Sequence, residues 1–132
     1  MRQASGVLPA EAAAVIDQLA RLDGARLEGV CTHFANADEA QPALSAAAQL
    51  AVFEQVIAAL PARPPLLHAS NSAGALALPA ARLDLVRCGI AVYGIDPSPE
   101  LAGALPLRPV LRLRSEISFV RRVAAGEGIS YG

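Results

Sequence analysis

Short apolar runs alternate with helical patterns along the sequence, and this rhythm limits the folds open to the chain. The apolar runs lie at residues 27–32, 65–69 and 83–86, and none shows a clean alternation of polar and apolar side chains. Helical patterns at residues 9–22 and 43–60 precede the first two runs, with apolar side chains recurring every three or four positions. Apolar strands joined by helices are typical of parallel β/α units buried on both faces. The sequence therefore predicts an α/β fold with three parallel strands.

The pattern changes after Gly94. A turn cluster at residues 96–99 is followed by Gly103 and Pro106, which favour an open segment. From residue 107 to residue 123, apolar side chains alternate with arginine and glutamate. This alternation predicts extended β structure and not another β/α unit. The organisation of the chain therefore changes after Gly94.

Composition excludes several classes of protein. Eleven basic residues nearly balance twelve acidic ones, so we expect no nucleic-acid partner and no membrane partner. The longest apolar stretches fall short of the ~20 residues that cross a bilayer, and the N-terminus lacks the apolar core of a secretion signal. Cys31 and Cys88 lie in or beside apolar runs, not in the spacing of a disulfide framework or a zinc site. We expect a reduced, cytoplasmic protein without a bound metal.

Three polar side chains follow the three predicted strands. His33, His68 and Arg87 each stand at or just past the end of an apolar run. Sites in parallel α/β folds gather at the carboxyl ends of the strands, where the following loops and helix N-termini converge. The shared placement indicates a common site. The alternative is that each residue is a hydrogen-bonded neighbour of the core with no shared role.

Two segments after the predicted strands offer backbone amides to an anion. Asn71 and Ser72 stand at the start of a short alanine-rich helix, and Gly89-Ile90 follow the third apolar run. Amides at a helix start favour phosphate, and a glycine lets the backbone approach an anion closely. Alternatively, Asn71 or Ser72 is a plain helix N-cap, and Gly89 belongs to an ordinary tight turn.

Tyr131 lies between glycines near the end of the sequence. Its local pattern is typical of a turn tyrosine at a hairpin. A phenol with a pKa near 10 becomes a usable base only where a cationic or histidine network stabilises the phenolate. A catalytic role for Tyr131 therefore depends on what surrounds it.

Four segments together resemble the alanine racemases, which are fold-type III pyridoxal-phosphate enzymes: THFANADE, HASNSAG, DLVRCGIAVYGIDP and GEGISYG. The resemblance covers nearly the whole chain and is most specific at VRCGIAVYG and GISYG. It implies the last βα units of a (β/α)8 TIM barrel in residues 1–103. Residues 104–132 would then supply the first strand or strands of a mostly β C-terminal domain.

The resemblance also implies an activity. Alanine racemases are homodimeric isomerases that interconvert L-alanine and D-alanine with pyridoxal 5′-phosphate, and so supply D-alanine for peptidoglycan. Carried over to this sequence, Ser72 and the amides of Gly89 and Ile90 would hold the phosphate, with Asn71 beside them.

The remaining site residues would act around the cofactor ring. Arg87 would face the pyridine nitrogen and keep it unprotonated, because arginine does not readily release a proton. His33 and His68 would orient Arg87 and tune Tyr131. Tyr131 would be the base on the L-alanine face, and it would reach the cofactor of the other subunit.

The chain departs from this family at one essential position. It contains no lysine, because all eleven basic residues are arginines, so the family's Schiff-base lysine has no counterpart here. We therefore expect a fragment that does not racemise alanine alone. Two alternatives stay open: a non-catalytic barrel relative that binds the same cofactor, and a degenerate racemase remnant. A racemase for serine or a broader range of amino acids also stays open.

Overall fold

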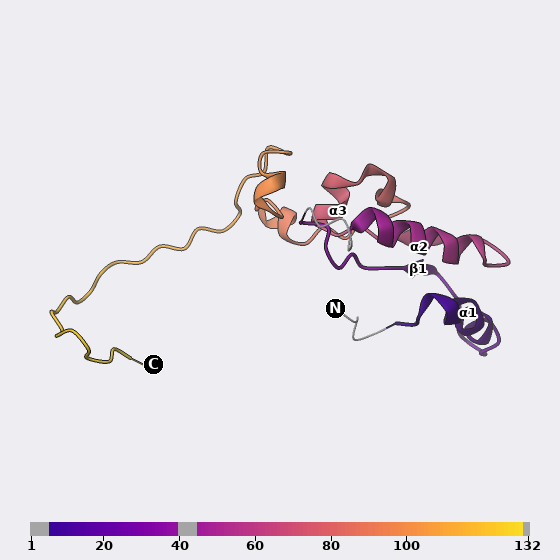
Figure 1. Ribbon diagram of the computed structural model, residues 1–132, viewed down its shortest axis with the longest axis horizontal. Coiled ribbons are helices and arrows are strands. Elements are labelled where there is room, and N and C mark those ends of the chain that lie inside the picture. Colours follow the sequence, from indigo (N-terminus) through magenta and orange to yellow (C-terminus); the bar gives the residue numbers. More distant parts are fainter. Residues whose placement is uncertain (1–5, 40–44, 131–132) are drawn as a thin grey trace.

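The computed structural model describes residues 6–39 and 45–130 of the chain (Figure 1). In these residues, two short strands alternate with three α-helices, and short 3-10 helices lie before and after them. The described elements are, in chain order, η1 (Pro9–Glu11), α1 (Ala12–Ala20), β1 (Gly29–Cys31), α2 (Ala46–Ala58), β2 (Leu66–His68), α3 (Ser72–Ala77), η3 (Pro79–Arg82), η4 (Ile90–Tyr93) and η5 (Pro99–Leu101).

The predicted helices are confirmed, with shorter ends. Pro9 opens the first helical segment, and α1 closes before Gly24, whose φ of 77° continues the chain in a left-handed conformation. Ser45 caps the start of α2, because its hydroxyl oxygen accepts the Ala48 N–H at 3.1 Å. None of the described helices has the length and hydrophobicity needed to cross a bilayer.

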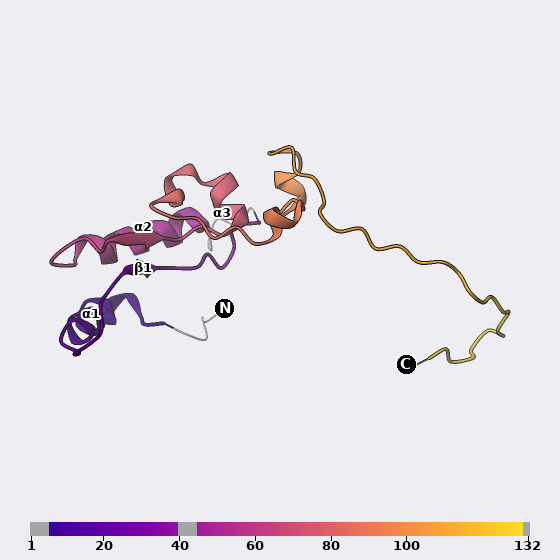
Figure 2. The ribbon, with the colours of Figure 1, turned by 180° about the vertical axis from the view of Figure 1, so that it is seen from behind.

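Strands β1 and β2 pair in parallel, as the first two apolar runs predict. Gly29 is opposite Leu66, and Cys31 is opposite His68, so the two strands end together. A compact core forms beside them, where Phe53 of α2 is buried with Phe34 and Leu67. Helix α2 runs beside the two strands in both opposed views of the ribbon (Figures 1 and 2). This packing fixes the carboxyl ends of β1 and β2 side by side.

The prediction of a third strand at residues 83–86 is wrong. Residues 83–84 form a turn and residues 85–88 have no regular structure, although they follow the free edge of β2. The Asp84 amide donates to the Leu67 carbonyl oxygen at 3.1 Å, and the Arg87 amide donates to the Ser70 carbonyl oxygen at 2.9 Å. The Leu67 N–H is taken by the Asp84 carboxylate at 2.8 Å, so a side chain replaces the carbonyl that a strand would present. The segment thus lies beside β2 without forming a β-ladder.

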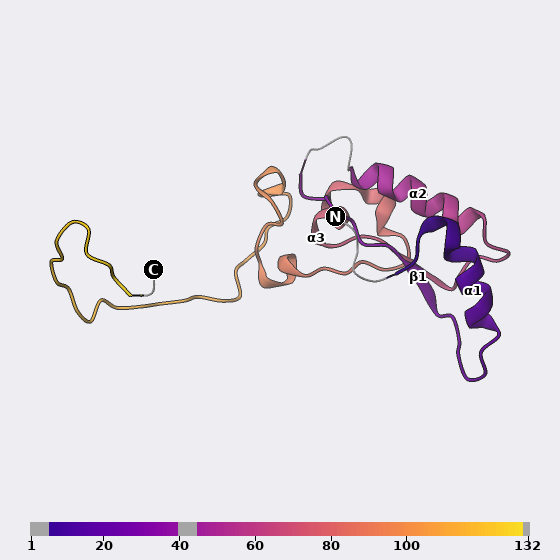
Figure 3. The ribbon, with the colours of Figure 1, turned by 60° about the horizontal axis from the view of Figure 1, so that its bottom comes forward.

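The prediction of β structure from residue 107 to residue 123 is also wrong, because the structure has no hydrogen-bonded strand there. The segment runs away from the other described elements (Figures 1 and 3), and its apolar side chains stand in solvent, with Leu113 93% exposed and Phe119 77% exposed. The alternating pattern is a real feature of the sequence, but a strand needs a hydrogen-bonded neighbour. Beyond Val110, the described residues provide none for this segment.

Candidate functional site

The guanidinium group of Arg87 lies between the loops that follow β1 and β2. Its Nη2 donates to the Thr32 carbonyl oxygen at 2.8 Å and to the Ala69 carbonyl oxygen at 3.0 Å. The same Nη2 lies 3.2 Å from His33 Nδ1, and Nη1 bonds to His68 Nδ1. The structure therefore brings together the three polar side chains predicted at the strand ends.

These contacts determine where the histidine protons lie. Arginine has only N–H donors, so each Nδ1 facing Arg87 must accept with its lone pair. A neutral His68 that accepts at Nδ1 carries its proton on Nε2. Burial lowers the pKa of His68 below its ordinary value of 6.5, and the charge of Arg87 lowers it further. The neutral ring is therefore the favoured form beside Arg87.

The Nε–H of Arg87 stays available, as does one of the two N–H groups of Nη1. Four acceptors surround the two Nη groups, whereas Nε–H bonds to no group among the residues that the structure describes. The side chain is half-buried, so this edge of the guanidinium can meet a ligand. The arrangement offers an oriented cationic N–H to an uncharged acceptor atom.

Ser72 forms a second polar centre, because it contacts Gly89, which lies two residues after Arg87 in the chain. Its buried hydroxyl oxygen accepts the Gly89 N–H at 2.9 Å and the Ala91 N–H at 3.3 Å. A hydroxyl has two lone pairs and one hydrogen, so both lone pairs are used and the hydrogen remains to be donated. An oxyanion is the natural acceptor for it.

The backbone next to Ser72 is open on one side. Gly89 is exposed, and a Cβ built on it would meet no atom within 4 Å. The neighbouring Ile90 N–H has no acceptor in the described part of the chain, whereas the Gly89 N–H is already given to Ser72. Two donors, the Ser72 hydroxyl and the Ile90 amide, thus stand beside an open surface.

Asn71 acts as a helix cap in the structure. Its Oδ1 accepts the Gly74 N–H at 2.9 Å at the start of α3. This contact is the alternative that the sequence left open for Asn71. Any contact between Asn71 and a cofactor stays a prediction.

Gln49 supports the site, and sequence reasoning missed it. From α2 it reaches the loop after β1, where its side chain bonds to Thr32, His33 and Ala35. No local pattern distinguishes it from the polar residues elsewhere on the same helix. Its role depends on the packing of α2 against the core, which brings it within reach of the loop.

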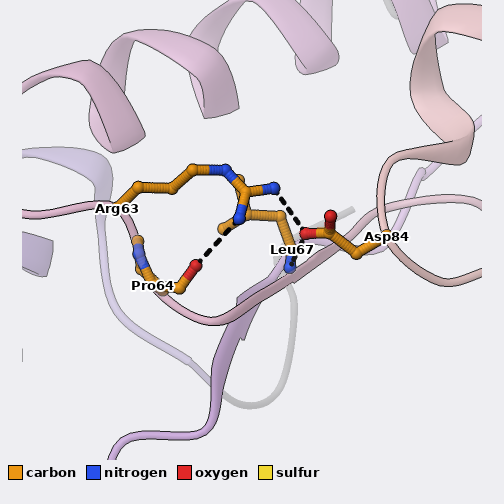
Figure 4. A network of polar contacts seen from close by, with 4 residues as sticks. All are labelled: Arg63, Pro64, Leu67 and Asp84. Atoms are coloured by element: carbon orange, nitrogen blue, oxygen red, sulfur yellow. Dashed lines mark hydrogen bonds and ion pairs between the residues drawn. The ribbon is translucent and has the colours of Figure 1, made fainter.

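Asp84 and Arg63 form a second support that sequence reasoning missed (Figure 4). The Asp84 carboxylate accepts the Leu67 N–H at 2.8 Å and pairs with Arg63 Nη2 at 2.5 Å, while Arg63 Nη1 donates to the Pro64 carbonyl oxygen at 3.1 Å. The Leu67 N–H, and then the Arg63 guanidinium, hold the pKa of Asp84 below its ordinary value. This network ties the segment that carries Arg87 to the edge of β2.

Tyr131 lies outside the described residues, so its proposed role as a base stays a prediction. The structure does bring together His33, His68 and Arg87, and it joins Ser72 to Gly89. Only Cys88 separates Arg87 from Gly89 in the chain. The two centres therefore form one candidate site, whose cationic end is Arg87 and whose oxyanion end is the pair of unused donors at Ser72 and Ile90.

Known proteins resemble this chain in sequence and in structure. The sequence profile of the family described as alanine racemase, N-terminal domain, matches residues 3–97. This chain belongs to the alanine racemase family. Over 130 residues it is 44% identical to the alanine racemase of Desulfovibrio desulfuricans. The aligned region covers 96% of this chain and 35% of that protein. It is also 42% identical, over 130 residues, to the alanine racemase of Symbiobacterium thermophilum.

Solved structures of the family share the arrangement of the chain. The alanine racemase of E. faecalis matches 98% of this chain with a TM-score of 0.79 at 38% identity. The alanine racemase of Bacillus anthracis with bound L-Ala-P matches 99% with a TM-score of 0.75 at 32% identity. This chain covers 35% of each of those two chains, so it spans about a third of the length of its racemase relatives.

Proposed function

We propose that this chain forms part of the pyridoxal 5′-phosphate site of an alanine racemase that interconverts L-alanine and D-alanine. The observation that carries the proposal is the set of acceptors around Arg87, in which two histidine rings and two carbonyl oxygens hold one guanidinium. A buried serine hydroxyl with an unused hydrogen lies close by in the same site. Membership of the racemase family supports the proposal that the two centres hold the same cofactor.

The oxyanion end fits the phosphate of the cofactor. The Ser72 hydroxyl and the Ile90 amide would donate to phosphate oxygens, and the missing side chain of Gly89 leaves room for the group to approach. Gly89 would contribute through its contact with Ser72, because its own amide already bonds to that hydroxyl. Asn71 would keep α3 in place through its cap.

The cationic end fits the ring nitrogen of the cofactor. The unused Nε–H of Arg87 would donate to that nitrogen without transferring a proton, because arginine does not readily release one. Bound there, pyridoxal 5′-phosphate supplies the electron withdrawal that loosens the α-hydrogen of an amino acid. Arg87 would keep that withdrawal moderate, which favours return of the proton over competing reactions.

Proton movement would fall to a tyrosine controlled by the histidines. His68 carries its ring proton on Nε2 and can donate it to a phenol oxygen, which favours the phenolate form. We propose Tyr131 as that phenol and as the base on the L-alanine face. An amino group that bonds the cofactor would have to come from residues other than these 132, because they include no lysine.

The remaining family features extend the proposal to the whole protein. Residues 1–103 would form the last βα units of a (β/α)8 barrel, and residues 104–132 would begin the C-terminal β domain. The working form would be a cytoplasmic homodimer in which Tyr131 serves the partner's cofactor. Its product would supply D-alanine for peptidoglycan.

The test is the substitution Arg87→Glu in the complete gene product that contains these residues. A carboxylic acid can protonate the ring nitrogen, so we expect racemisation of alanine to fall about 100-fold or more. Chiral chromatography of alanine incubated with the enzyme and pyridoxal 5′-phosphate measures this. Arg21→Glu, which makes the same change at an exposed ion pair at the end of α1, is the matched control and should retain activity.

Two results would contradict the proposal. An unmodified gene product that racemises no alanine, although it binds pyridoxal 5′-phosphate, would indicate a non-catalytic relative. Equal activity of the Arg87→Glu enzyme and the unmodified enzyme would show that Arg87 does not face the ring.

A further inference from the structure

The side chain of Gln49 uses its donors and its acceptor on a single loop. Its Nε2 donates to Thr32 Oγ1 at 2.9 Å and to the His33 carbonyl oxygen at 2.7 Å, and its Oε1 accepts the Ala35 N–H at 3.1 Å. A carboxamide has two N–H donors and one oxygen acceptor, so both donors and the oxygen are committed. All three partners belong to the loop at residues 32–35.

This loop supplies two of the four acceptors around the Arg87 guanidinium. The Thr32 carbonyl oxygen lies 2.8 Å from Arg87 Nη2, and His33 Nδ1 lies 3.2 Å from the same atom. Gln49 therefore bonds to the two residues of the loop that contact the guanidinium. It does not contact Arg87 itself.

The helix that carries Gln49 is a firm support. The adjacent Leu50 and nearby Phe53 are buried in the core, so α2 is anchored directly beside the glutamine. His33 and Ala35, in contrast, are exposed on the loop. Phe34, between them, is buried against the core. The Thr32 N–H also donates to the His68 carbonyl oxygen at 3.2 Å. The hydrogen bonds of Gln49 thus add the support of α2 to a loop that β2 and the buried Phe34 ring also hold.

We propose that Gln49 is a positioning residue for Arg87. By fixing the Thr32 carbonyl and the His33 backbone, it sets the direction in which the guanidinium points. The proposal rests on the proposed function only for the use of Arg87 against the cofactor ring. The dependence of Arg87 on Gln49 is a property of the chain without any ligand.

The experiment compares two pairs of variants in the complete gene product without cofactor. Gln49→Glu keeps the shape and the acceptor but removes both donors and places a negative charge beside two oxygen atoms. Gln55→Glu makes the same change at an exposed position of α2 and is its control. Thr32→Val removes only the hydroxyl that Gln49 donates to, and Thr32→Ser restores it.

The readout is the ¹⁵N NMR signal of the Arg87 guanidinium, assigned by its loss in Arg87→Lys. Acceptors that hold the two Nη groups hinder their rotation and keep their signals separate. We expect separate signals in the unmodified protein, Gln55→Glu and Thr32→Ser, and averaged signals in Gln49→Glu and Thr32→Val. Loss of one oriented contact should also weaken pyridoxal 5′-phosphate binding about tenfold in these two variants.

Each outcome decides the proposal. A folded Gln49→Glu protein with separate, unshifted Arg87 signals would overturn it. If Gln49→Glu fails to fold, Thr32→Val decides, and unchanged signals there would overturn the proposal equally. If the Arg87 signals depend on Gln49 while pyridoxal 5′-phosphate does not bind to the unmodified protein, the proposed function fails and the positioning role stands.

Discussion

At the scale of single residues, His68 shows how the site controls protonation. Its Nδ1 faces Arg87, and both burial and the guanidinium charge lower the pKa of its ring. Because the folded state disfavours the charged ring, the neutral form is present over a wider pH range than in the unfolded chain. A neutral His68 is what allows Arg87 to donate to it.

The pKa of His68 gives a direct prediction. An NMR titration of the folded protein should place its midpoint below 6.5, the ordinary value. The free energy of unfolding should therefore be greatest above pH 6.5 and should decrease as the pH falls from 6.5 through the folded midpoint. Below that midpoint, His68 should cause no further decrease in the free energy of unfolding.

A variant separates the two causes of the shift. In Arg87→Met the charge is gone but burial remains, and burial is the larger cause. We expect the midpoint of His68 to rise while staying below 6.5. A midpoint at or above 6.5 in the unmodified protein would contradict the account of the neutral ring.

The sequence predicted the residues of the site better than the residues that support them. His33, His68 and Arg87 each follow an apolar run, and parallel strands bring such positions to one edge. Gln49 and Asp84 act across 17 residues each, on Thr32 and on Leu67. Such contacts depend on how α2 packs and how the chain turns at Leu83, where φ is 47°, and neither has a local pattern.

At the scale of elements, the first two strands follow from their short apolar runs and the helices from their periodicity, and β1, β2 and α2 share one core. The third run failed as a strand because the Asp84 side chain takes the Leu67 N–H that a ladder would use. The alternating segment after residue 107 failed because alternation describes a half-buried strand but supplies no neighbour for it.

Gly94 joins the β/α part of the chain to this segment. Its φ is 76°, and a Cβ built on it would lie 1.8 Å from the Arg108 carbonyl oxygen. The close approach lets the Val110 N–H donate to the Tyr93 carbonyl oxygen at 3.1 Å. Only glycine meets both requirements.

Gly94→Ala and Gly103→Ala form a matched pair that tests this close approach of Gly94 to Arg108. Both glycines have a left-handed backbone, with φ of 76° and 75°, but a Cβ on Gly103 would meet no atom within 4 Å. Each alanine should cost about 1–2 kcal/mol in backbone strain. Gly94→Ala should cost about 1–3 kcal/mol more from the overlap.

Urea unfolding of the complete gene product measures the difference between these two variants. Hydrogen exchange of the Val110 amide shows in addition whether the segment has separated from Gly94. Equal free energies of unfolding with equal protection of Val110 would show that the close approach at Gly94 does not hold the segment that begins at residue 107.

At the scale of the whole molecule, the chain carries one side of a site and a long exposed apolar segment. It spans about a third of the length of the alanine racemases it matches, yet up to 99% of it superimposes on one of them. Side chains such as Leu113 and Phe119 are exposed here, and residues outside this chain would be needed to cover them. The barrel and the β domain are in this sense expectations about the complete protein.

The most direct test of the account is the protonation state of the cofactor's ring nitrogen in the complete gene product. Pyridoxal 5′-phosphate labelled with ¹⁵N in the ring and bound to the protein reports this state through its NMR shift. We expect an unprotonated nitrogen at neutral pH, because Arg87 donates a hydrogen bond without releasing its proton. A protonated nitrogen in the unmodified protein would contradict the placement of Arg87 against the ring.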